Sequence, residues 1–382
     1  MAGAPSEAQV CSLRAAAAAD CHQFVNRLPF LDWTRGLAVL IMIQCHAFNC
    51  LVRPELRGGG PYILSQFVGG MAAVLFLFLA GVTSAFQMEK LDRRGATARQ
   101  RLTAIFRRAG YMMVLAFAFR FNNALFQWNG PAWNSVWKVD ILNCMGASMA
   151  LLAAAALCRG RARARAAAVA GLAIACASPW ISAADWSGVP QVVRDYLVPN
   201  RAAFALFPWA AYLAFGVAAG TVLRRIAADR MERALQWGVL LGFGLISGGQ
   251  YFSNLPYSLY RRTDFWTDSP ALVIIRLGVV LLILAWAYLW TEHIAGQGWS
   301  WMQTMGKTSL LVYWVHIMLV YGWMGDHWKK TFGIWEATAA TVAVTLLMLL
   351  LAMARLAWSA RARRPASVPA AARAAAAEAS AS

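Results

Sequence analysis

The sequence is dominated by apolar runs that are long enough to cross a lipid bilayer. A helix needs about 20 residues, at a rise of about 1.5 Å each, to span the hydrocarbon core. Runs of this length recur along the 382-residue chain, which is 60% hydrophobic and 14% charged. A soluble domain is only about half apolar and about a quarter charged. The sequence therefore predicts an all-α fold, a polytopic transmembrane helical bundle.

The hydrophobic runs predict about ten spans. We place them at roughly residues 34–52, 63–87, 105–125, 139–158, 166–183, 202–223, 234–253, 269–290, 307–324 and 334–357. The fifth run is the weakest, because it is short and rich in alanine. Residues 28–358 would form the membrane domain. Residues 1–27 would be an N-terminal tail without a cleaved signal peptide, and residues 359–382 a disordered C-terminal tail.

The net charge of +18 is distributed in a way that indicates membrane topology. Lys and Arg gather after the second, fourth, sixth and tenth runs, at residues 90–108, 159–165, 224–233 and 355–364. Such clusters mark cytoplasmic loops. We therefore expect both tails in the cytoplasm and the protein in the inner (plasma) membrane of a bacterium. The charges form no continuous basic face and no nucleic-acid motif, so we expect no nucleic-acid partner.

The first run, LDWTRGLAVLIMIQCHAFNCLVR, carries a polar stripe. Arg35 and His46 are eleven residues apart, about three helical turns, and Asn49 continues the same face. A polar stripe is expensive in lipid and should face the bundle interior or a wet cavity. With the N-terminus inside, Arg35 lies at the cytoplasmic mouth and His46 about 16 Å deeper. This suits a long anionic donor, although Arg35 could be a topology anchor and His46 a structural hydrogen-bonding residue.

The ninth run, GKTSLLVYWVH, offers a second stripe. Ser309, Tyr313 and His316 are spaced by four and three residues and therefore share a face. This helix also starts on the cytoplasmic side, so His316 should lie at a depth similar to that of His46. Two imidazoles near one midplane are a plausible acid–base pair.

Other polar residues stand at the ends of the runs. Arg107 and Arg108 open the third run from the cytoplasm, and Asp140 and Asn143 begin the fourth at the outer face. Asp140 could equally cap that helix. Arg120 and Arg276 lie within runs and are functional candidates, but snorkelling toward the outer interface would explain them as well.

No pattern in the sequence predicts a metal site. The seven Cys residues form no Cys-x-x-Cys pair and have no metal-ligand spacing with His, so we interpret them as small apolar residues. The candidate catalytic residues are His46 and His316. The candidate substrate-binding residues are Arg35, Arg107, Arg108, Asn49, Asp140, Asn143 and Tyr313.

These residues resemble those of the transmembrane acyltransferases. The Arg35-x10-His46 spacing matches the Arg/Lys-x10-His motif of the acyltransferase 3 family. Four later blocks resemble the heparan-alpha-glucosaminide N-acetyltransferase catalytic-domain family. They are FVGGMAAVLFLFLAGVTSAF, VDILNCMGASMALL, LFPWAAYLAFGVAAG and MGKTSLLVYWVH.

The resemblance implies acetyl-CoA or another acyl-CoA as cytoplasmic co-substrate, no permanently bound cofactor, and a sugar or glycan acceptor on the far side. Arg35 would meet the anionic part of the donor, Arg107 and Arg108 would match basic residues of the third span, and His46 would be catalytic. The lysosomal heparan enzyme instead has Asn at the position of His46 and a catalytic His in the following loop. Residues 47–62 here contain no His. We therefore predict direct transfer, with His46 as general base.

Two other classes of function compete with this interpretation. Basic and polar stripes in a bundle also suit a transporter or channel for a small anionic solute. Internal repeats with broken helices would favour that reading, and the sequence shows none. A structural or assembly protein with incidental histidines is the third candidate.

Overall fold

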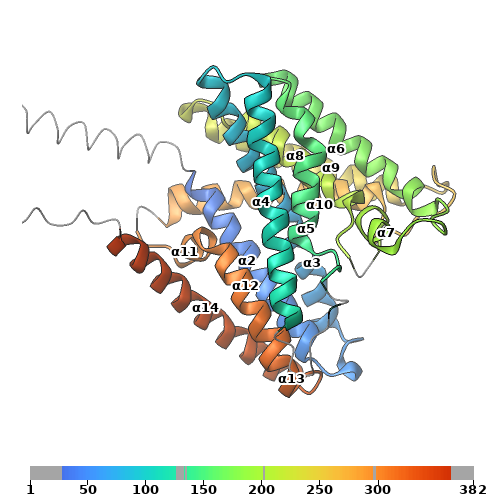
Figure 1. Cartoon of the computed structure of the whole chain (residues 1–382), viewed down its shortest axis with the longest axis vertical. Helices are drawn as coiled ribbons and strands as arrows, with labels where there is room; N and C mark the ends of the chain where they lie inside the picture. Colours follow the sequence, from blue (N-terminus) through green and yellow to red (C-terminus); the bar gives the residue numbers. More distant parts are fainter. Residues whose placement is uncertain (1–27, 126–132, 134–135, 201–202, 296–297, 363–382) are drawn as a thin grey trace, which may run out of the picture.

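The computed structural model describes residues 28–125, 133, 136–200, 203–295 and 298–362. These residues form helices joined by loops, and the only β contact among them is an isolated bridge between Val52 and Phe332. Seven of the helices are long and apolar enough to cross a membrane. The predicted all-α membrane bundle is therefore confirmed (Figure 1).

The seven helices correspond to seven of the predicted runs. They are α2 (Pro29–Leu51), α3 (Gly60–Arg93), α4 (Ala98–Leu125), α6 (Gly160–Ala183), α8 (Leu206–Leu223), α10 (Pro270–Leu289) with its π-helical continuation η5 (Trp290–Ile294), and α14 (Ile334–Ala362). The weak fifth run is one of them, as α6.

The other three predicted runs form shorter, less apolar or broken helices. Residues 139–158 fold into α5 (Ile141–Leu151) and the 3-10 turn η3 (Leu152–Ala156), which are short for a span. Residues 234–253 lie in α9 (Met231–Ser253), whose glycines and glutamines lower its hydrophobicity. The ninth run is bent by 82° between α11 (Trp301–Lys307) and the stretch Ser309–Trp328. Counting that bent pair gives eight spans, fewer than the ten predicted.

The remaining elements are short. The stretch Ser309–Trp328 comprises α12 (Ser309–Ile317), the π-helical η6 (Met318–Trp323) and α13 (Met324–Trp328). The loops hold η1 (Pro54–Leu56), α7 (Gln191–Leu197) and η4 (Ala228–Arg230). Helix α14 continues to Ala362, past the predicted domain boundary at residue 358. The predictions for residues 1–27 and 363–382 lie outside the described residues.

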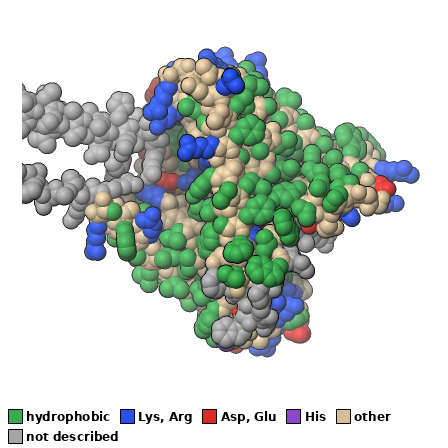
Figure 2. All heavy atoms as spheres, viewed as in Figure 1, with side chains coloured by type: hydrophobic (Ala, Val, Ile, Leu, Met, Phe, Trp, Pro, Cys, Tyr) green, Lys and Arg blue, Asp and Glu red, His purple; other side chains and the backbone are tan. Residues whose placement is uncertain are grey.

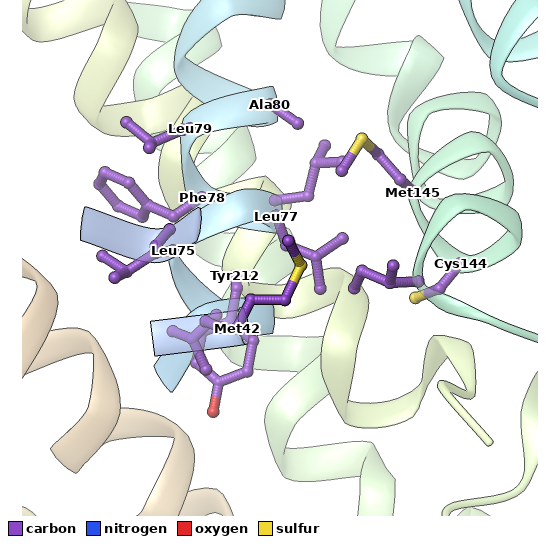
Figure 3. Packing of buried hydrophobic residues seen from close by; sticks show 14 of the residues in the cluster. Met42, Leu75, Leu77, Phe78, Leu79, Ala80, Cys144, Met145 and Tyr212 are labelled. Carbon is purple, nitrogen blue, oxygen red and sulfur yellow. The ribbon is translucent and has the colours of Figure 1, made fainter. Parts of the chain in front are cut away.

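Glycines allow the central helices to pack closely. A Cβ at Gly81 of α3 would collide with the carbonyl oxygen of Leu213 in α8, and one at Gly216 of α8 with that of Phe78 in α3. Small residues at such contacts are the usual means of close helix packing in membranes. Figure 3 shows buried side chains of α2, α3, α5 and α8 in this core, among them Met42 and Tyr212.

Arginines of three predicted cytoplasmic clusters meet at one end of the bundle. Arg163 of α6 is fully buried and contacts Glu89 at 3.3 Å and Asp92 at 2.6 Å, both on α3. Arg101 of α4 also binds Asp92, at 2.6 Å, and Arg225 after α8 binds Glu89, at 3.0 Å. We call Glu89, Asp92, Arg101, Arg163 and Arg225 the ion-pair cluster. Figure 2 shows basic side chains at the edges of this face and hydrophobic ones across its middle.

Helices α2 and α14 run antiparallel, so the two ends of the described chain lie at the same end of the bundle (Figure 1). The end of α2 is tied to the loop before α14, because the Lys330 amide donates to the Cys50 carbonyl at 3.0 Å. Arg35 lies in the first two turns of α2, at the end of the bundle opposite that contact.

Candidate active site

The two histidines of the predicted stripes form a hydrogen-bonded pair. Nδ1 of His46 on α2 lies 2.9 Å from Nε2 of His316 on α12. Their rings are almost parallel, with an interplanar angle of 4° and centroids 5.2 Å apart. His316 is fully buried, and its Nδ1 lies 2.7 Å from the carbonyl oxygen of Val312. The structure therefore brings both candidate catalytic residues into one site.

The carbonyl of Val312 sets the proton positions in this pair. A carbonyl oxygen only accepts, so Nδ1 of His316 must carry a hydrogen. In the neutral His316 ring, Nε2 is then an acceptor, and Nδ1 of His46 must donate to it. A neutral His46 therefore has its lone pair on Nε2, which has no hydrogen-bond partner among the described residues. The pair holds one imidazole ready to accept a proton.

His46 lines a cavity of about 810 Å³. Lining residues come from α2, α3, α4, α5, α8, α10, α12, η6 and the loops at the end of the bundle where α2 finishes. These loop residues include Lys138, Asn200, Thr267 and Lys329. The cavity therefore opens at the end of the bundle opposite Arg35. A cavity of this size can hold a ligand of several rings' volume, since small-molecule sites are about 300–1,000 Å³.

Tyr313 and Asp140 also lie on the cavity wall. Tyr313 is buried, with its ring centroid 5.9 Å from that of His316. The Asp140 side chain accepts from the amides of Leu142 and Asn143, so its alternative role as a helix cap is confirmed. It also forms an ion pair with Arg120 at 3.1 Å.

Asn49 and Asn143 contact residues near the cavity rather than lining it. The amide of Asn49 donates to the hydroxyl of Tyr321 at 3.2 Å, and Tyr321 lines the cavity with its ring 5.4 Å from that of His46. The amide of Asn143 donates to the hydroxyl of Tyr196 at 3.1 Å. Both asparagines therefore support the wall in this structure.

The basic residues predicted for the donor lie apart from this cavity. Arg35 is about one-fifth exposed and pairs with Asp32 at 2.9 Å. Arg108 of α4 donates to Thr83 at 2.8 Å and is near enough to Arg35 for the two guanidinium groups to interact. Arg107, the preceding residue of α4, is exposed. Arg35 and Arg108 are therefore two neighbouring cations toward the end of the bundle opposite the mouth of the cavity, and we call them the Arg35–Arg108 site.

Several lining residues were not singled out as site candidates from the sequence. Cys45, Trp209, Tyr321 and Lys329 lack a spacing that would have marked them. Arg120 and Arg276 had been noted, with snorkelling as the alternative, and the structure places both on the cavity wall. No group of three metal-ligating side chains occurs within the part of the chain that the structure describes.

The helical bundle with a histidine pair beside a cavity defines a membrane-embedded protein with a candidate acid–base site. The acyltransferase domain of the acyltransferase 3 family matches residues 28–353, and the chain belongs to this family. No protein with a curated description matches it. The closer likeness of individual blocks to the heparan-alpha-glucosaminide N-acetyltransferase family stays a prediction.

Proposed function

We propose that this acyltransferase moves an acyl group, acetyl as the first candidate, from a cytoplasmic acyl-CoA to a hydroxyl or amine of a sugar or glycan on the far side of the membrane. The observation that carries the proposal is the His46–His316 pair on the wall of a cavity that opens away from Arg35. In this proposal the acceptor enters through the cavity, and the donor approaches His46 from the side of Arg35.

The Arg35–Arg108 site is suited to the phosphates of a coenzyme A thioester. Guanidinium groups bind phosphate oxygens with charge-assisted hydrogen bonds. Arg35 and His46 share a face of α2 about 16 Å apart along the axis, so a donor held at Arg35 has to extend its acyl end toward His46. Both residues lie on the one continuous helix α2, so this distance is set by the helix itself.

The chemical step needs one proton acceptor. The acceptor's hydroxyl oxygen attacks the thioester carbonyl, and Nε2 of His46 takes the hydroxyl proton. The carbon–sulfur bond then breaks, the sulfur leaves with the bonding electron pair, and His46 returns the proton to it. The products are the ester and free coenzyme A. While His46 is charged, its Nδ1–H bond to neutral His316 strengthens, because hydrogen bonds from a cation are about twice as strong as neutral ones.

His46 is the first residue to test. In purified full-length protein in lipid nanodiscs, we expect His46→Ala to lower acetyl transfer from acetyl-CoA about 10²–10⁴-fold, the usual contribution of general-base catalysis. Transfer is followed by thiol release with a panel of methyl glycosides, and donor binding by calorimetry. Donor binding should stay near wild type. His46→Asn is the sharper variant, because Asn keeps a hydrogen bond but cannot take the proton.

Arg35→Ala gives the contrasting result expected for a donor-binding residue. It should raise KM for acetyl-CoA while kcat at saturating donor changes little, and Arg35→Lys should be milder. Near-normal transfer by His46→Asn would show that His46 only positions substrate. A wild-type protein that neither binds nor cleaves acyl-CoA would overturn the proposed donor.

A further inference from the structure

The cavity wall carries more positive than negative charge. Its lining includes the cations Arg120, Lys138, Arg276 and Lys329, but only one carboxylate, that of Asp140. This carboxylate is engaged by Arg120 and by the start of α5. The other three cations form no ion pair with any carboxylate in the described part of the chain. The lining therefore has three positive charges without a counter-charge.

Arg276 is the cation whose position is hardest to explain without a ligand. It lies six residues, about 9 Å, inside the spanning helix α10. Its guanidinium carbon is 5.7 Å from the ring centroid of Trp209, and a Cβ at Gly70 would be 3.3 Å from its Nη2. It thus lies between α8 and α3. The ring of Trp209 and the neighbouring hydroxyl of Tyr212 offset part of the cost of a charge at this depth, but neither is a counter-ion.

We infer that the acceptor is an anionic glycan, whose carboxylate or phosphate group binds Arg276 while a hydroxyl or amine of the same molecule lies against His46. Both side chains line the same cavity. This inference rests on the proposed function and names the class of acceptor for it. A bound anion would supply the missing counter-charge through charge-assisted hydrogen bonds.

Two further features of the cavity fit such a ligand. Lys138 and Lys329 are exposed, so they place positive charge where an anion would enter. Trp209 and Trp266 line the wall as well, and an aromatic ring offers a flat apolar surface to the face of a sugar. A neutral sugar would use the aromatic rings alone and leave Arg276 without an anionic partner.

Binding of matched disaccharides tests the inference without requiring catalysis. We would titrate the full-length protein in nanodiscs with a glucuronic acid-containing disaccharide, with the same disaccharide after reduction of its carboxyl to an alcohol, and with the reduced form carrying a phosphate ester. Tryptophan fluorescence reports binding, because Trp209 contacts Arg276. We expect both charged ligands to bind at least about tenfold more tightly than the neutral one. The tighter of the two identifies a sugar carboxylate or a phosphate ester as the natural group.

Variants assign this preference to Arg276. Arg276→Gln should remove most of the preference for charged ligands while leaving neutral binding unchanged, and Arg276→Lys should retain part of it. Arg262→Gln is the matched control, because Arg262 is exposed in the loop before α10 and does not line the cavity. It should behave as wild type.

The outcomes separate this inference from the proposed function. Equal binding of charged and neutral disaccharides by the wild-type protein would overturn the anionic acceptor, even if acyl transfer to the neutral sugar is observed. Preferential anion binding that depends on Arg276, without any acyl transfer, would support the anion site and count against the proposed reaction. A third outcome is that Arg276→Gln loses charged and neutral ligands equally, with Arg276→Lys also failing to bind either. That result would show that Arg276 only holds the helices together.

Discussion

His46 and His316 are 270 positions apart in the sequence, yet one hydrogen bond joins them. His46 is half-buried and lines the cavity, whereas His316 is fully buried and anchored to the backbone of its own helix. The division of exposure implies a division of work. In the proposed reaction, His46 meets the acceptor, and His316 is a positioning residue that fixes which nitrogen of His46 is the base.

Replacing His316 should reveal that positioning role. His316→Ala leaves Nδ1–H of His46 without an acceptor, so we expect kcat to fall about 10–100-fold while KM for acetyl-CoA stays nearly constant. His316→Gln has an amide oxygen that can accept from His46, and it should recover part of the loss. Steady-state kinetics on the purified protein measure both. A Gln variant as inactive as the Ala variant, with normal folding, would argue against an acceptor role.

At the scale of elements, α3 and α8 are the framework that carries the cavity wall. Gly70 on α3 and Trp209 on α8 flank Arg276, and the same two helices are in glycine-mediated contact farther along at Gly81 and Gly216. Because that contact is between backbones, a larger side chain there must push the helices apart.

Gly216→Ala should therefore destabilise the protein by about 1–3 kcal/mol, the usual range for overpacking. Gly244→Ala is the control, because a Cβ at Gly244 in α9 meets nothing within 4 Å. Replacing glycine by alanine at an open helical position should instead stabilise slightly, by about 0.5–1 kcal/mol. Thermal unfolding in detergent, followed by tryptophan fluorescence, should give shifts of opposite sign. If Gly216→Ala raised the unfolding temperature as Gly244→Ala does, α3 and α8 would be able to separate without penalty.

At the scale of the whole molecule, the two ends of the bundle differ in chemistry. One end holds the buried ion-pair cluster, in which Arg163 alone bridges two carboxylates. The Arg35–Arg108 site lies toward that end as well. The other end holds the mouth of the cavity. The proposed transfer between the two sides of the membrane needs such an asymmetry.

The orientation of the bundle can be measured directly. Reporter fusions inserted after Gly58, between α2 and α3, and after Cys158, before α6, should report opposite sides, with the second in the cytoplasm. The reason is that four Arg residues lie at positions 159–165, whereas the loop at residue 58 has only Arg53 and Arg57, beside Glu55. The same side for both fusions would contradict the topology and, with it, the assignment of Arg35 to the cytoplasmic mouth.

The sequence by itself determined that the chain lies in a lipid bilayer, that its spans are helical, and which polar residues share a face of a helix. Hydrophobic length requires a bilayer, and backbone groups in lipid must be satisfied within helices, so little freedom was left for the fold class. Helical spacing also placed Arg35 with His46 and Tyr313 with His316, because residues three or four apart share a face in any helix. Equal depth made the two histidines candidates for a pair.

Only the tertiary structure decided which stripes meet and what surrounds them. Periodicity describes one helix at a time, whereas a cavity depends on how several helices pack. For this reason the sequence left Arg120 and Arg276 undecided between lipid interface and site. It could not show that Asp140 both caps α5 and neutralises Arg120. The 82° bend before α12 likewise turns a continuous apolar run into a broken helix. Interhelical contacts fix such features, and residue spacing along one chain does not encode them.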